Sequence, residues 1–181
     1  HSGRRTVVAK HQEIAGLSAA RYQIAWIGKE GDTWAIRKSG LDGSNLTEIG
    51  RTKDRPLAVW TDGHTTVWMV EPASPPTVAG FIPPLGRRTQ VWLAVGHDSH
   101  QTAQIAEGLM SGEILGVRDG ALYLVGVRDE GIRCSVFYAV EADKPPRRFA
   151  AETGAVAAVM ASDGRILWTA PSRGSNSMLT A

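Results

Sequence analysis

The amino-acid sequence predicts an all-β fold made of repeated four-stranded antiparallel units. Short apolar runs alternate with period two, which is the spacing of half-buried strands. Asp-Gly pairs, which favour tight turns, separate several of these runs. Similar hairpins recur with a period of about 40–45 residues once a proline-rich insert is allowed for. The 20 glycines and nine prolines of the 181-residue chain also favour many turns and short strands.

Length, charge and cysteine content restrict the architecture and the partners. A chain of 181 residues suits one domain with a sizeable core. The net charge is +2 with acids and bases interspersed, which argues against a nucleic-acid surface. No apolar run is long enough for a membrane-spanning helix. The single cysteine, Cys134, has no partner for an intrachain disulfide, and we interpret it as a small buried hydrophobe.

The clearest unit runs from Arg21 to Ile49. Apolar side chains two apart at 22–26 and 34–36 predict two strands, and the turn between them contains two glycines. The turn Leu41–Asn45 and a short third strand, Leu46–Ile49, follow.

Two segments before this unit are harder to assign. Thr6–Ala9 is a candidate first strand. Residues 11–20 could form a short helix, but Gly16 weakens that interpretation. We therefore expect a loop or an irregular strand leading into Arg21.

The hairpin after Ile49 suggests an internal repeat. Trp60 and Trp68 flank its Asp62-Gly63 turn and are eight residues apart, as Trp26 and Trp34 are. The segment Glu71–Arg88 holds five prolines and is expected to be an excursion or a long loop at one end of the fold.

The remaining chain contains further strands and Asp-Gly hairpins. Gln90–Val95 predicts a strand, Gly96–His100 a turn and Thr102–Ala106 a short outer strand. Hairpins around Asp119 and Asp163 mark the third and fourth units. The predicted strands of these two units are 114–117, 121–125, 134–139, 147–150, 156–160 and 165–169. A single domain is expected over 4–171, with a mobile polar tail over 172–181.

The number of predicted strands does not decide whether the sheets close into a ring. The fourth unit has only two predicted strands, so Thr6–Ala9 could supply an outer strand and close a propeller of about four blades. Alternatively, the chain is part of a larger propeller that further sequence or a second chain completes. A two-sheet β-sandwich would accommodate the same strands without a repeat.

The unit at 21–49 resembles the blade repeat of TolB-like β-propellers, in the WD40-like propeller superfamily. The resemblance is carried by Leu41-Asp42-Gly43-Ser44-Asn45 and the following Leu46, Thr47 and Ile49. The proline-rich insert and the lack of a Ser-Pro-Asp-Gly turn depart from that family, and Ser162-Asp163-Gly164 comes closest. The resemblance implies a bacterial, extracytoplasmic (periplasmic or secreted) scaffold that binds a protein or peptide at the mouth of a central channel.

Residues with catalytic or metal-binding potential are few. His97-Asp98-Ser99-His100 could contribute to a zinc site, but no nearby Cys or His supplies further ligands. The sequence contains no nucleophile elbow, P-loop or Rossmann fingerprint. We therefore predict no metal, no cofactor and no catalytic residue, and favour a protein that is not an enzyme.

The candidate binding residues come from turns, basic pairs and tryptophans. All six tryptophans fall in strand runs, where packing between blades is expected, and Trp60 has the best prospect of exposure because it adjoins a turn. The candidate binding residues are Trp60, His64, Arg87, Arg88, Trp92, His97, Asp98 and His100.

Three functions remain open at this point. The first is a non-enzymatic module that binds a protein or peptide through loops at one end, with Glu71–Arg88 and Gly96–His100 as contact sites. The second is a propeller that gates a prolyl-oligopeptidase-like hydrolase. The third is a carbohydrate-binding propeller with exposed tryptophans. Self-association that completes the propeller is a further expectation.

Overall fold

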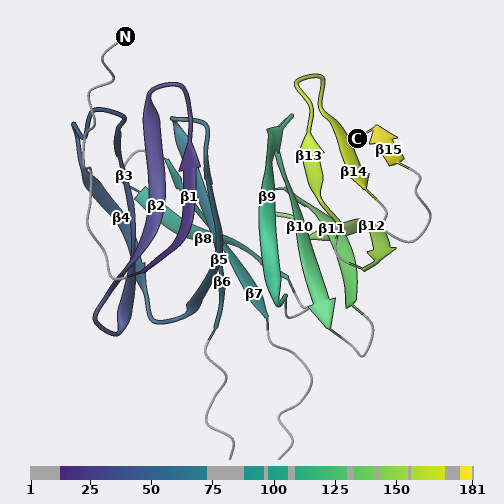
Figure 1. Ribbon diagram of the computed structural model, residues 1–181, viewed down its shortest axis with the longest axis horizontal. Helices are drawn as coiled ribbons and strands as arrows, with labels where there is room; N and C mark the ends of the chain where they lie inside the picture. Colours follow the sequence, from purple (N-terminus) through teal and green to yellow (C-terminus); the bar gives the residue numbers. More distant parts are fainter. Residues whose placement is uncertain are drawn as a thin grey trace, which may run out of the picture.

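The computed structural model describes residues 13–72, 88–95, 98–105, 109–129, 133–141, 143–154, 156–169 and 176–180. Within these residues every regular element is a β-strand, and the strands form four antiparallel sheets (Figure 1). The strands are β1 (Ile14–Ala19), β2 (Gln23–Glu30), β3 (Thr33–Gly40), β4 (Thr47–Thr52), β5 (Arg55–Thr61), β6 (Thr65–Glu71), β7 (Thr89–Val95), β8 (Asp98–Ile105), β9 (Ser111–Arg118), β10 (Ala121–Asp129), β11 (Arg133–Glu141), β12 (Arg147–Thr153), β13 (Ala158–Met160), β14 (Arg165–Thr169) and β15 (Asn176–Thr180). The predicted all-β fold is confirmed.

Each sheet is an antiparallel meander in chain order. The first sheet is β1–β4, the second β5–β8 and the third β9–β12, while the fourth contains β13, β14 and β15 among the described residues. The first strands of successive sheets lie next to one another, so the sheets follow each other like blades around a common side (Figure 1). The predicted four-stranded repeat unit is therefore confirmed in three complete copies.

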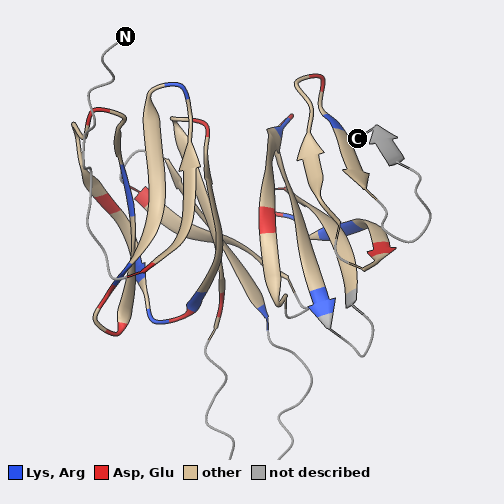
Figure 2. Ribbon diagram, in the orientation of Figure 1, with Lys and Arg blue, Asp and Glu red and all other residues tan. Residues whose placement is uncertain are grey.

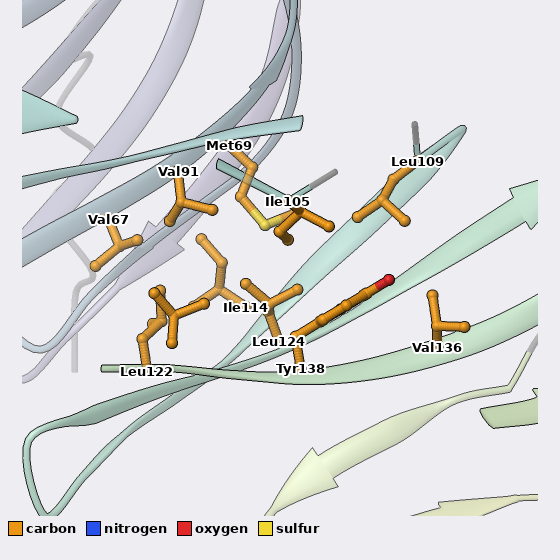
Figure 3. Packing of buried hydrophobic residues seen from close by; sticks show 11 residues of the cluster. Val67, Met69, Val91, Ile105, Leu109, Ile114, Leu122, Leu124, Val136 and Tyr138 are labelled. Atoms are coloured by element: carbon orange, nitrogen blue, oxygen red, sulfur yellow. The ribbon is translucent and has the colours of Figure 1, made fainter. Parts of the chain in front are cut away.

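The core is divided into layers between neighbouring sheets. Ile27 and Ile36 of the first sheet pack with Val59 and Trp68 of the second. A second layer joins the second and third sheets, and Figure 3 shows its side chains converging from the two sheets. A third layer joins Phe137 of the third sheet to the fourth sheet. Each fully buried Ile or Phe contributes about 1.5–3 kcal/mol to stability through removal of apolar surface from water.

The second sheet is buried on both faces, which distinguishes the fold from a sandwich. Consecutive residues Val67, Trp68, Met69 and Val70 of β6 are all buried. Trp68 and Val70 belong to the layer shared with the first sheet, and Val67 and Met69 to the layer shared with the third. A two-sheet sandwich has only one buried face per sheet, so that alternative is not the observed architecture.

The sequence analysis treated the two tryptophan hairpins as equivalent parts of successive repeats, and this inference was wrong. Trp26 and Trp34 lie on β2 and β3, whereas Trp60 and Trp68 lie on β5 and β6. The two hairpins therefore occupy different places in their sheets, and the equivalent strand of Trp26 in the second sheet is that of Trp68. The shared spacing of eight arises because both hairpins have short turns and strands of similar length.

The Asp-Gly turns serve chain reversal, as predicted, but with different backbones. Asp119 and Gly120 both have positive φ, 50° and 77°, the combination that a type I′ turn requires. At Asp62-Gly63 only the glycine has positive φ, 99°. There the Asp62 carboxylate instead accepts hydrogen bonds from the backbone N–H groups of His64 (2.8 Å) and Thr65 (2.7 Å).

The segments predicted near the two ends of the chain are only partly within the described residues. The irregular strand expected before Arg21 is confirmed as β1, with a register shift between Ile14 and Gly16. Thr6–Ala9 lies outside the described residues, as does most of Glu71–Arg88. Within the expected tail, β15 pairs with β14 as a third strand of the fourth sheet. No described segment forms a helix of the length and apolar character that a membrane crossing needs.

Candidate binding surface at the first end of the sheets

The antiparallel order places the turns at two opposite ends of the sheets. The β1–β2, β3–β4, β5–β6 and β7–β8 connections share what we call the first end, and the β2–β3 and β6–β7 connections share the second end. The strands that bound the predicted contact segments Glu71–Arg88 and Gly96–His100 therefore place the described ends of the two segments at opposite ends of the second sheet.

Three turns at the first end are linked, either directly or through the strands that carry them. The N–H of Leu41 donates a hydrogen bond to the carbonyl oxygen of Tyr22 at 3.2 Å. The N–H of Thr61 donates to Ser18 Oγ at 3.1 Å, which ties the second sheet to the first. We call residues 20–22, 41–46 and 62–64 the turn surface: the first bond joins two of these turns, and the second joins the strands that lead into 20–22 and 62–64.

The turn surface presents large apolar side chains to solvent. Tyr22 is 69% exposed, Leu46 54% and Leu41 51%. The guanidinium of Arg21 lies 5.0 Å from the centre of the Tyr22 ring. Tyrosine and arginine are the side chains that most often anchor protein partners, so this combination is suited to recognition.

Local hydrogen bonds hold the backbone of the turn surface. The Asp42 carboxylate accepts from the hydroxyl of Ser44 at 2.6 Å and from its N–H at 3.0 Å. These bonds favour the ionised carboxylate and lower the pKa of Asp42. Gly43 and Asn45 have positive φ, 85° and 54°, which lets the chain reverse tightly between the two leucines. Asp42 thus acts through the shape of the turn.

The candidate tryptophans lie between sheets instead of on the surface. Trp60 is half-buried and packs against the layer between the second and third sheets. Trp92 is also half-buried and stacks on Trp68, with ring centroids 6.1 Å apart and planes 10° apart. Its Nε1–H donates to Gln90 Oε1 at 3.2 Å. Both indoles therefore hold blades together.

The remaining candidates are dispersed. His64 is exposed within the turn surface, and Asp98 and His100 are exposed at the start of β8. Arg88 is exposed at the second end, where its Nη1 donates to Gln104 Oε1 at 3.4 Å. Arg87 and His97 lie outside the described residues. Of the described candidates, only His64 belongs to the turn surface.

The sequence analysis missed Tyr22, Leu41 and Leu46 as binding candidates. The two leucines were noted only as part of a repeat motif, and Tyr22 only as a strand residue. The available signal was the position of the leucines at either side of the polar turn Asp42–Asn45, where a purely structural turn needs no large apolar side chain.

Charged side chains of the first sheet are paired with each other. Acidic and basic residues alternate over the described sheets without a large region of one sign (Figure 2). In the first sheet, Arg37 bonds Glu30 (2.5 Å) and Glu48 (2.9 Å), and Arg51 bonds the same two carboxylates. Hydrogen bonds from Arg37 and Arg51 lower the pKa of Glu30, and bonds from Arg51 and Arg37 lower that of Glu48.

The described residues offer little that could support metal binding. They contain no group of three or more His, Cys, Asp and Glu side chains placed to hold a metal ion. Cys134 is half-buried against the layer between the second and third sheets, which agrees with a packing role. The geometry that stands out is therefore the exposed apolar turn surface.

Comparison with known proteins supports the fold. No protein-family model and no curated protein matches the sequence. Among solved structures, one of a nidogen/laminin complex matches with a TM-score of 0.59 and 15% identity, covering 92% of this chain and 60% of that chain. The β-propeller domain of the Trilobed protease from Pyrococcus furiosus matches with a TM-score of 0.56 and 15% identity, covering 90% of this chain and 52% of that chain. TolB from Acinetobacter baumannii matches with a TM-score of 0.51 and 12% identity, covering 93% of this chain and 43% of that chain.

These similarities show the fold, and the chain spans no more than about three fifths of the three matched structures. Four blade-like sheets follow one another, but no strand of the described fourth sheet is hydrogen-bonded to the first sheet. The chain therefore has a β-propeller fold in the form of a partial, open propeller.

Proposed function

We propose that the chain is a non-enzymatic interaction module that binds a protein or peptide through the turn surface at the first end. The observation that carries this proposal is the exposure of Tyr22, Leu41 and Leu46 on two turns, 20–22 and 41–46, which the hydrogen bond from Leu41 to Tyr22 holds together. Removing the exposed apolar surface of each of these side chains from water under a partner would favour binding. Loops held by a sheet scaffold lose little freedom when they bind.

The chemistry of the turn surface favours a partner with an apolar segment and an acidic group. Tyr22 and the leucines supply apolar area, and Arg21 supplies a fixed positive charge above the ring. An extended peptide could place an apolar side chain beside Tyr22 and a carboxylate beside Arg21. The resemblance of this unit to TolB-like repeats is consistent with an extracytoplasmic bacterial setting for such binding.

The test is peptide selection on the purified chain. Peptides from a displayed random library that bind the wild type are expected to bind Tyr22→Ser or Leu41→Ser at least tenfold more weakly, since truncating a central anchor commonly costs 2 kcal/mol or more. Met110→Ala is the matched control, because Met110 is 42% exposed but lies at the second end. Selected peptides that bind all four proteins equally would place recognition elsewhere and overturn the proposal.

The geometry gives less support to a carbohydrate-binding propeller or to a propeller that gates a hydrolase. None of the six tryptophans is among the exposed large side chains, so the flat apolar platform that a carbohydrate-binding propeller needs is not seen. We expect a flat tryptophan-fluorescence titration with oligosaccharides. The likeness to the Trilobed protease propeller concerns the fold and carries no catalytic residue to this chain.

A further inference from the structure

A pocket of about 380 Å³ lies at the turn between β11 and β12 of the third sheet. Its lining comes from this one hairpin and consists of Ala139, Glu141, Lys144, Pro145, Pro146 and Arg147. The volume is at the lower end of the range of about 300–1,000 Å³ that pockets for small molecules have. The turn surface belongs to the first and second sheets, so the pocket is a separate feature of the molecule.

The turn that forms the pocket is held in one conformation. The N–H of Lys144 donates a hydrogen bond to the carbonyl oxygen of Glu141 at 3.4 Å, and Asp143 has a positive φ of 58°. The rings of Pro145 and Pro146 fix φ in the segment that follows. Apolar walls that are already ordered lose little conformational freedom when a ligand binds against them.

Strand register places Arg147 in the pocket and its neighbour Arg148 on the other side of the sheet. Arg147 is paired with Ala139, and Ala139 with Tyr123. Directly paired residues share a face, so all three lie on the face toward the fourth sheet, where Tyr123 packs. Arg148 is paired with Tyr138, which packs on the opposite face, in the layer shared with the second sheet. The two adjacent arginines therefore belong to different faces.

The charged groups of the pocket leave one net positive charge. Lys144 Nζ donates a hydrogen bond to Glu141 Oε2, so these two charges are paired. Arg147 is exposed, and among the described residues no hydrogen bond or ion pair engages its guanidinium. The hydrogen bond from Lys144 and, to a lesser extent, the charge of Arg147 lower the pKa of Glu141. The guanidinium therefore lies close to the Lys144–Glu141 pair and adds a positive charge to it.

We propose that this pocket binds a small monocarboxylic acid with a compact apolar body. The carboxylate accepts hydrogen bonds from the Arg147 guanidinium, whose donors form the fork that suits a carboxylate. The apolar body lies against Ala139 and the two prolines. Glu141 repels a second negative charge, so the pocket favours a monocarboxylate over the dianion of a phosphate monoester.

The test is a titration of the purified chain with benzoate, followed by two-dimensional NMR of its backbone amide groups. We expect the signals of the β11–β12 hairpin to shift. Benzamide lacks the charge and acetate lacks the apolar body, so each should bind about tenfold more weakly than benzoate. Arg147→Gln should weaken benzoate binding at least tenfold, because it removes the charge-assisted hydrogen bonds. Arg148→Gln is the matched control and should leave binding unchanged, since this arginine is on the other face of the sheet.

Glu141→Gln tests the sign of the electrostatic contribution. It removes the negative charge beside the ligand and releases Lys144 from its ion pair, so benzoate should bind about threefold more tightly. Amide spectra that match the wild type outside the hairpin show that each variant is folded. The proposal would be overturned if benzoate did not bind, if benzamide bound as tightly as benzoate, or if Arg147→Gln and Arg148→Gln had equal effects.

Discussion

Trp68 of the second sheet packs directly on Gly50 of the first sheet. A Cβ atom added to Gly50 would lie 2.9 Å from Trp68 Cζ2, closer than such atoms approach in real proteins. Trp68 is only 3% exposed, and Trp92 stacks on it. A similar contact brings Met69 of the second sheet against Gly112 of the third. Glycine on a strand therefore provides space for a large side chain from a neighbouring blade.

Gly50→Ala should destabilise the protein by about 1–3 kcal/mol, because the added methyl group overpacks the contact with Trp68. The intrinsic preference of a strand acts in the opposite direction, because it favours alanine over glycine by roughly 0.5–1 kcal/mol. The measurement is chemical unfolding followed by circular dichroism. In a Trp68→Leu background the same change should cost less, and equal costs in the two backgrounds would show that the residues are not coupled.

Asp119→Val should lower the free energy of unfolding by about 1–2 kcal/mol, because a β-branched residue resists the left-handed backbone at φ 50°. Asp119→Asn should be nearly neutral, since asparagine accepts this conformation at the first central position of a type I′ turn. Thermal unfolding of the two variants provides the comparison. Equal destabilisation by both would mean that the carboxylate, and not the backbone conformation, matters at this turn.

Ser135→Ala should cost about 1–3 kcal/mol, because it leaves two backbone groups without their partner. The Ser135 hydroxyl donates to the carbonyl oxygen of Gly154 at 2.8 Å and accepts from the N–H of Val156 at 3.1 Å. Ser135 is fully buried, so solvent cannot replace these bonds without a change in structure. Ser111→Ala, at an exposed strand position, is the control and should stay within about 0.5 kcal/mol in the same unfolding experiment.

The stabilising contribution of Glu30 and Glu48 should depend on pH in the acid range. Arginine hydrogen bonds lower both pKa values below the ordinary 4.5. The contribution is therefore complete above about pH 4.5 and is lost as the pH falls through the lower pKa values of the folded protein. The double variant Glu30→Gln/Glu48→Gln should be less stable than the wild type at pH 7, with a difference that shrinks toward pH 3.

Urea unfolding at several pH values measures this difference. Glu113→Gln is the control, because Glu113 is exposed on β9 outside the network of Glu30, Arg37, Glu48 and Arg51. A wild-type advantage over the double variant that does not change between pH 7 and pH 3 would contradict an ionic origin.

The positions of most strands could be predicted because their signals are local. β2, β3 and β10 carry runs of apolar residues bounded by glycine-containing turns, and these are properties of neighbouring residues. The same holds for His64, Asp98 and His100, which are exposed because they are polar residues next to turns. The two tryptophan hairpins were wrongly matched because hairpins with strands of similar length have similar sequence patterns at any position in a sheet.

Which side chains reach the surface could not be predicted in the same way. Tyr22 and Trp26 alternate on the same strand run, yet Tyr22 is 69% exposed and Trp26 3% exposed. In β6 six consecutive residues are buried, so alternation gives no information about faces there. Exposure depends on where the neighbouring sheet ends, which is a property of the assembled fold.

By itself, the sequence determined that this protein is all β, where its hairpins turn, and that its units repeat. Those features follow from side-chain alternation and from the backbone preferences of glycine and aspartate, which act within a few residues. Only the tertiary structure decided that the sheets stack with both faces buried, that Trp60 and Trp92 lie between blades, and that Tyr22 and Leu41 form an exposed surface. These outcomes depend on packing between residues far apart in the chain, such as Gly50 and Trp68, for which no local pattern codes.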